Sequence, residues 1–152
     1  MIEVKNLNKS FGNFKSLDNL SLNVKKGSVY GLVGPNGAGK TTFIKNLMGI
    51  YRPDSGSMTV NGEEVYENPA LKQKIIYISD DLFFFTTYSI LDTAKLYADI
   101  YKDWDWETFN KLKEIFKIDV KRKCCRLSKG MQKQVAFWLG ICTKPDLSLI
   151  HI

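Results

Sequence analysis

The sequence predicts an α/β domain, and three observations lead to that prediction. A segment that is apolar at nearly every position, residues 28–33, leads into a glycine-rich turn and then into a helix over residues 40–48. The dipeptide Asn61-Gly62 stands between two short strands, 57–60 and 63–66, and is a strong hairpin signal. Apolar residues then recur at helical spacing from about residue 86 to 126. We therefore expect one α/β domain that carries a helical insertion.

The other predicted elements follow from local patterns. Residues 2–6 and 17–24 alternate apolar and polar side chains, as half-buried strands do, and residues 74–78 form a further short strand. Ser89 with Asp92 three residues later resembles a capping box that begins a helix. A last helix is expected over residues 129–143, ending before Pro145.

Composition narrows the class of protein. The chain has 152 residues, 44% of them hydrophobic and 25% charged, which excludes a disordered, collagen-like or coiled-coil chain. A net charge of +6 suits an anionic partner but does not choose between nucleotide, nucleic acid and lipid. The longest apolar run, residues 135–142, is far shorter than the roughly 20 residues that cross a bilayer. Three cysteines without metal-ligand spacing suggest reduced thiols in a cytosolic protein.

The glycine-rich turn is predicted to be a phosphate-binding loop, and the alternative is a chance glycine-rich turn. It fits G-x-x-x-x-G-K-[ST] at every fixed position and lies between a strand and a helix, as the mechanism requires. Its backbone N–H groups and the start of the helix would face phosphate oxygens. Lys40 would bridge the β- and γ-phosphates, and Thr41 would offer its hydroxyl to Mg²⁺. The expected nucleotide-binding residues here are Gly34, Asn36, Gly37, Ala38, Gly39, Lys40, Thr41 and Thr42.

A second motif, Leu127-Ser128-Lys129-Gly130-Met131, begins the last helix. With the phosphate-binding loop it makes residues 1 to about 146 resemble the ATP-binding cassette family, the ATPase subunits of ABC transporters. The resemblance implies a P-loop NTPase (RecA-like) core, an antiparallel β subdomain and a helical subdomain of about 86–143 that carries this signature motif. In the family the signature contacts ATP held by the opposite subunit. The same residues also fit an N-cap serine before an amphipathic helix.

The resemblance also implies a function. We expect a dimer that closes on two Mg·ATP and is driven by ATP hydrolysis, works with a transmembrane permease subunit at the cytoplasmic face of the membrane, and binds no nucleic acid. The LSKGM form is similar to ATPases of ABC-2-type exporters, which favours export. Two alternatives stay open: an ABC-type ATPase that acts on translation or DNA repair, and a nucleotide-binding module without catalysis.

Three further features take their interpretation from the family. Phe11 lies 23 residues before Gly34, where the family has an aromatic residue that stacks on adenine; core packing is the alternative. Asp80 stands in place of a metal-binding Gln, so it is either a magnesium ligand beside Thr41 or, with Asp81, a cap of its loop. The run Leu82-Phe83-Phe84-Phe85 either faces the permease or packs beneath the helical insertion.

The end of the sequence departs from the family. After Pro145-Asp146 the family has about four apolar residues, then a magnesium-binding Asp and a catalytic Glu, but His151 and Ile152 occupy those positions. Imidazole is a poor magnesium ligand and isoleucine accepts no proton, so the 152-residue chain is not expected to hydrolyse ATP. Residues 147–152 are also what CTG TCT CTT ATA CAC ATC encodes, a transposase end sequence used in sequencing libraries. We expect a non-native tail on a truncated domain of residues 1–146; the alternative is a genuine truncated paralogue.

Overall fold

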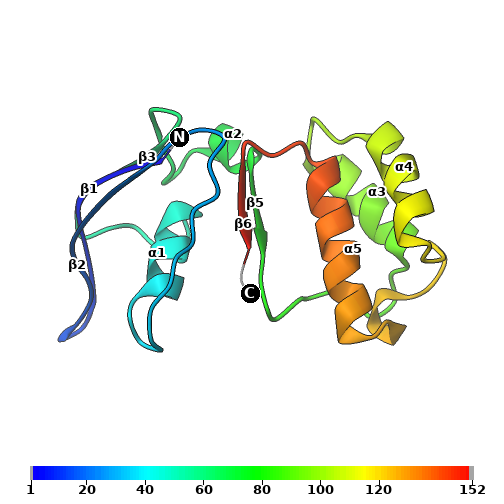
Figure 1. Cartoon of the computed structure of the whole chain (residues 1–152), viewed down its shortest axis with the longest axis horizontal. Coiled ribbons are helices and arrows are strands. Elements are labelled where there is room, and N and C mark those ends of the chain that lie inside the picture. Colours follow the sequence, from blue (N-terminus) through cyan, green and yellow to red (C-terminus); the bar gives the residue numbers. More distant parts are fainter. Residues whose placement is uncertain (1, 151–152) are drawn as a thin grey trace. The chain divides into compact units, whose positions relative to one another are not determined.

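Four antiparallel strands dominate the first part of the chain in the computed structural model, which describes residues 2–150 (Figure 1). They are β1 (Ile2–Phe11), β2 (Phe14–Val24), β3 (Ser55–Val60) and β4 (Glu63–Glu64), in the order β2-β1-β3-β4. The predicted hairpin at Asn61-Gly62 is confirmed, since both residues have the positive φ that a tight two-residue turn requires, 52° and 85°. The second strand of that hairpin is shorter than the predicted 63–66.

Two helices accompany this sheet. Helix α1 (Lys40–Leu47) contacts β2 and ends where Gly49 takes a positive φ of 64°. Its apolar stripe is confirmed, because Phe43 and Leu47 are buried. The sequence did not predict that Asn46 would also be buried, nor the single-turn helix α2 (Pro69–Lys72).

The predicted strand over residues 28–33 is wrong for this structure. The segment has no regular secondary structure, and Val29 and Val33 are 103% and 93% exposed. A strand needs a neighbour that satisfies its N–H and C=O groups, and no strand within residues 2–150 pairs with this segment. The parallel part of the predicted core therefore consists of β5 (Ile75–Ile78) and β6 (Leu147–Ile150), paired from Ile75↔Leu147 to Ile78↔Ile150.

The predicted helical region lies in the second part of the chain (Figure 1). It contains α3 (Ile90–Ile100), α4 (Trp106–Phe116), the short 3₁₀ helix η1 (Cys124–Arg126) and α5 (Lys129–Cys142). The capping box at Ser89 is present with both of its hydrogen bonds, and Asp105 caps α4. The helices share a core of Ile90, Ala94, Phe109, Ile118, Cys124, Leu127, Val135, Trp138, Leu139 and Cys142.

The chain divides into two compact units, Met1–Lys72 and Gln73–Ile152, where the sequence suggested a single domain with an insertion. The boundary falls before β5, because this strand packs against α5 and pairs with β6 rather than with the antiparallel sheet. The phosphate-binding loop thus belongs to the first unit and the signature motif to the second.

Trp138 is the side chain on which the helical core depends most. It is fully buried, stacks on Phe109 at 4.7 Å and on Phe116 at 5.7 Å between ring centroids, and its Nε1 donates to the Phe109 carbonyl at 3.0 Å. Trp138→Ala should lower the free energy of unfolding by about 3–5 kcal/mol, measured by urea denaturation. Trp106→Ala, at a 40% exposed ring, should cost much less. Equal losses for the two variants would contradict this assignment.

The sequence also predicted reduced cysteines and no apolar run long enough to cross a bilayer. All three cysteines are free, and burial raises the pKa of the Cys142 thiol to about 12, which keeps that side chain protonated. Within residues 2–150 no helix combines the length and the apolar character needed to span a membrane.

Candidate nucleotide-binding site

The phosphate-binding loop leads directly into α1, and the backbone favours glycine at two of its positions. Gly37 and Gly39 have φ values of 84° and 82°, and Gly39 is the N-cap of α1. A Cβ at Gly39 would lie 2.5 Å from the carbonyl oxygen of Ser16. The loop therefore lies in close contact with the beginning of β2. Any side chain at position 39 would collide with the Ser16 carbonyl oxygen.

Lys40 lies across this loop. Its Nζ donates to the carbonyl oxygens of Gly34, at 2.5 Å, and Pro35, at 2.8 Å. The first intrahelical bond of α1 is made by the Phe43 amide, which donates to Gly39, so the amides of residues 40–42 precede the hydrogen-bonded part of the helix. An ammonium group and a helix N-terminus thus converge on one exposed loop, an arrangement that suits a polyphosphate.

Thr41 and Thr42 differ in their surroundings. Thr41 is exposed and available as a metal ligand. The Thr42 hydroxyl oxygen accepts a hydrogen bond from Ser16 Oγ at 2.8 Å, which ties α1 to β2. The sequence predicted both residues as part of the site, but the tie to Ser16 could not be read from a motif, because the two residues are 26 positions apart.

Phe11 lies at the end of the β1–β2 hairpin, opposite Phe14. It is 44% exposed, so the core-packing alternative is wrong. Its ring meets that of Tyr51 at 5.3 Å. Since β2 begins beside the phosphate-binding loop, the hairpin presents an exposed aromatic ring within the same unit as that loop.

The signature residues occupy the start of α5. Ser128 is the N-cap, and its Oγ accepts from the Met131 amide at 3.3 Å. Leu127 is buried and Met131 packs partly against the helical core, whereas Ser128, Lys129 and Gly130 are exposed. The N-cap interpretation is confirmed, and the same geometry leaves an open helix N-terminus on the surface.

Comparisons with known proteins decide the family. A family model described as ABC transporter matches residues 17–150. The chain belongs to the ABC transporter family. It is 33% identical over 150 residues to the ABC transporter ATP-binding protein YtrB of Bacillus subtilis (strain 168), which covers 99% of the chain and 51% of YtrB. It is 28% identical over 155 residues to the spermidine/putrescine import ATP-binding protein PotA of Nitrosomonas eutropha, covering 99% of the chain and 43% of PotA. The chain thus spans about half the length or less of these relatives.

Solved structures confirm the ABC ATPase fold. The structure of an ATP-binding subunit of an ABC transporter matches with a TM-score of 0.89 and 24% identity, over 99% of the chain and 65% of that protein. The ATP-binding cassette MJ0796, in a dimeric post-hydrolysis state bound to ADP and Pi, matches with a TM-score of 0.82 and 20% identity, over 99% and 73%. At these identities the likeness concerns the fold alone.

Asp80, the other candidate metal ligand of this ABC transporter family member, has a protein partner. Its Oδ1 accepts from Lys133 Nζ on α5 at 2.7 Å, with both side chains nearly half exposed. In the same loop the Ser79 hydroxyl accepts from the Asp81 amide at 3.2 Å. Within residues 2–150 no group of three or more His, Cys, Asp or Glu is arranged to hold a metal ion. His151 and Ile152 lie outside the described residues.

The phenylalanine run of this ABC transporter family member divides between surface and core. Phe84 packs against the helical core, as the packing alternative expects, whereas Phe83 is 81% and Phe85 47% exposed. Phe83 contacts Phe85 at 5.4 Å and Phe85 contacts Tyr88 at 5.0 Å. We call Phe83, Phe85 and Tyr88 the surface aromatic cluster.

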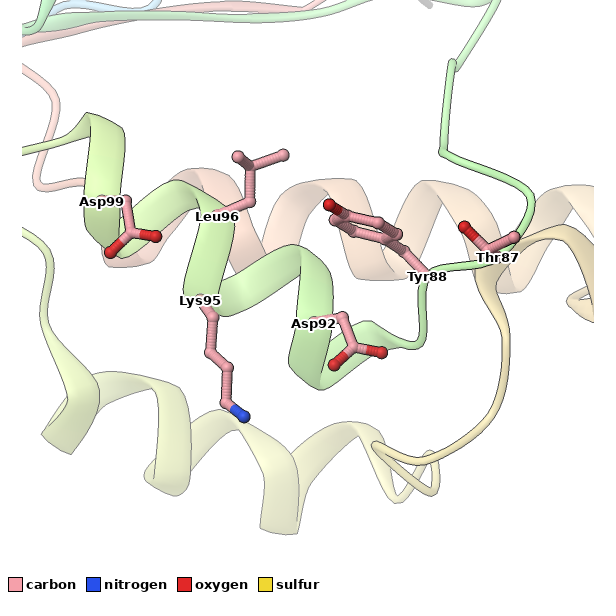
Figure 2. Close-up of a pocket in the computed structure, with 6 residues that line it drawn as sticks. All are labelled: Thr87, Tyr88, Asp92, Lys95, Leu96 and Asp99. Carbon is pink, nitrogen blue, oxygen red and sulfur yellow. The ribbon is translucent and has the colours of Figure 1, made fainter.

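Tyr88 of this cluster also lines a pocket of about 460 Å³ (Figure 2). It contains none of the predicted nucleotide-binding residues. The Ser89 hydroxyl and amide, which donate to the Asp92 carboxylate, hold the pKa of that group below its usual range, so it is anionic at neutral pH. The residues that line the pocket are Thr87, Tyr88, Asp92, Lys95, Leu96 and Asp99.

Proposed function

We propose that the chain is the ATP-binding part of an ABC transporter ATPase subunit. Residues 34–42 bind the phosphates of Mg·ATP and Phe11 stacks on the adenine, while the signature residues 127–131 close on the nucleotide of a second ATPase subunit. The observation that carries the proposal is the exposed loop where Lys40 and the N-terminus of α1 converge, tied to β2 by Ser16 and Thr42. The dimer described for MJ0796 with ADP and Pi supports a dimeric arrangement for this chain.

The residues of the loop fit Mg²⁺ and ATP. The Thr41 hydroxyl is a hard oxygen donor of the kind that Mg²⁺ prefers, and the bound ion would neutralise phosphate charge. Asp80, in the second unit, accepts a hydrogen bond from Lys133, and its role as a magnesium ligand remains a proposal from the sequence. Because His151 and Ile152 stand where the family has its metal-binding Asp and catalytic Glu, we propose that the 152-residue chain binds ATP without hydrolysing it.

We also propose a permease partner at the cytoplasmic face of the membrane. The support is the surface aromatic cluster, because exposed aromatic rings beside a pocket are typical of protein interfaces. The LSKGM signature favours export. Relatives such as PotA are named for import, so membership of the family leaves the direction open.

The proposal is tested by isothermal titration calorimetry of the 152-residue chain with Mg·ATP and with AMP, followed by a phosphate-release assay. We expect binding of ATP, much weaker binding of AMP because it lacks the β- and γ-phosphates, and no release of phosphate. Equal affinity for the two nucleotides would contradict the phosphate-loop assignment. Phosphate release by the 152-residue chain would contradict the role given to the missing Asp and Glu.

A further inference from the structure

Two braces join the β1–β2 hairpin to the phosphate-binding loop and its helix. The first is the hydrogen bond between Ser16 and Thr42, beside the close approach of Gly39 to Ser16. The second is the contact between Phe11 and Tyr51, which follows the end of α1. All of these residues belong to the first unit. The β1–β2 hairpin, which carries the Phe11 ring, is therefore linked to the beginning of α1 through Thr42 and to the segment after α1 through Tyr51.

The contact at Tyr51 is built from several interactions. The rings of Phe11 and Tyr51 meet edge to face, with 5.3 Å between centroids and 69° between planes. Lys45 Nζ lies 5.4 Å from the Tyr51 ring centroid, and the Tyr51 amide donates to the Lys45 carbonyl at 3.2 Å. These contacts fasten Tyr51 to the last turn of α1.

Phe11 is fastened on its other side. Lys9 Nζ lies 5.6 Å from the Phe11 ring centroid and pairs with Asp54 at 2.7 Å. Asp54 also accepts from the Ser10 amide at 2.6 Å. Lys9 and Tyr51 thus restrict the orientation of a ring that is otherwise 44% exposed.

We propose that Tyr51 is a positioning residue for the base of the nucleotide. By holding the Phe11 ring against the end of α1, it sets the distance between that ring and the phosphate-binding loop, so that one ATP molecule can use both. This inference rests on the proposed function and goes beyond it, since neither motif of the sequence includes Tyr51. A preorganised ring loses less conformational freedom when the base stacks on it, which raises affinity for ATP. Inorganic triphosphate has no base to stack on Phe11, so its affinity should not depend on the contact between Phe11 and Tyr51.

The test compares ATP with inorganic triphosphate, both with Mg²⁺, by isothermal titration calorimetry. Tyr51→Leu should weaken ATP binding about 3- to 10-fold, the value of an edge-to-face ring pair, and should leave triphosphate affinity unchanged. Tyr51→Met should behave in the same way and provides a second apolar variant if Tyr51→Leu folds poorly. Tyr51→Phe retains the ring and should retain the ATP affinity.

Two controls separate positioning from a structural role. Tyr66→Leu removes a tyrosine of the same unit whose ring lies under Arg52, at 5.8 Å, and should leave the ratio of the two affinities unchanged. Because Tyr51 acts through Phe11, Tyr51→Leu should add little to the loss caused by Phe11→Ala.

Three results would overturn the inference: equal weakening of ATP and triphosphate by Tyr51→Leu, an unchanged ATP affinity in that variant, or full additivity with Phe11→Ala. If the unsubstituted chain bound neither ATP nor triphosphate, the proposed function itself would fail. If it bound both but the Phe11→Ala variant lost none of the preference for ATP, only the base-stacking role and the brace would fail.

Discussion

Replacement of Lys40 by alanine is expected to lower the affinity for Mg·ATP about 10- to 100-fold. A charge-assisted hydrogen bond contributes about 1.5–3 kcal/mol, and each 1.4 kcal/mol is a factor of ten in the binding constant. In the structure the Lys40 ammonium already bridges the carbonyls of Gly34 and Pro35. The variant therefore loses both a cation that meets the phosphates and an internal tie that holds the loop closed.

The measurement is isothermal titration calorimetry of the variant and of a matched control. Lys26→Ala removes the same charge from an exposed position outside the loop and should change the affinity little, because long-range attraction between exposed charges is screened by salt. Urea denaturation of both variants separates a loss of contacts from a loss of fold. An unchanged affinity in Lys40→Ala would refute the assignment of residues 34–41.

Features that depend on nearby residues could be predicted from the sequence. The Ser89 capping box, the Asn61-Gly62 hairpin and the end of α1 at Gly49 each involve residues within a few positions of one another. The phosphate-binding loop belongs to the same class, since Gly37 and Gly39 adopt the positive φ that a motif of this kind requires. The conformation of a cap or a turn depends on a few neighbouring residues, and the structure has the predicted conformation at each of these positions.

Features that depend on distant partners could not be predicted. Residues 28–33 have the composition of a buried strand, but a strand forms only beside a neighbour, and periodicity does not reveal whether one is present. The ion pair between Asp80 and Lys133 spans 53 positions, and the Thr42–Ser16 hydrogen bond spans 26. These contacts show that the Asp80 carboxylate is paired with a cation and that the Thr42 hydroxyl is tied to β2.

Replacement of Ser128 by arginine is expected to abolish ATP-driven closure of the dimer while leaving ATP binding to a single subunit unchanged. Ser128, Lys129 and Gly130 form an exposed helix start, and a Cβ added at Gly130 would meet nothing within 4 Å. This open surface is where we expect the nucleotide of the second subunit to lie. A long side chain at position 128 would fill that space, and it would also remove the N-cap bond to Met131, at a cost of about 1 kcal/mol in stability.

The experiment uses a slowly hydrolysed ATP analogue and follows dimer formation by light scattering. Ser128→Thr keeps the capping hydroxyl and should still dimerise, and Lys129→Arg keeps both charge and bulk at the neighbouring position and serves as the second control. Because residues 34–42 are unchanged in all three variants, we expect monomer affinity for ATP to be the same in each. Dimerisation of Ser128→Arg as strong as that of the unsubstituted protein would show that residues 127–131 do not meet the nucleotide. Loss of ATP binding in the Ser128→Arg monomer would show that they serve the chain's own site instead.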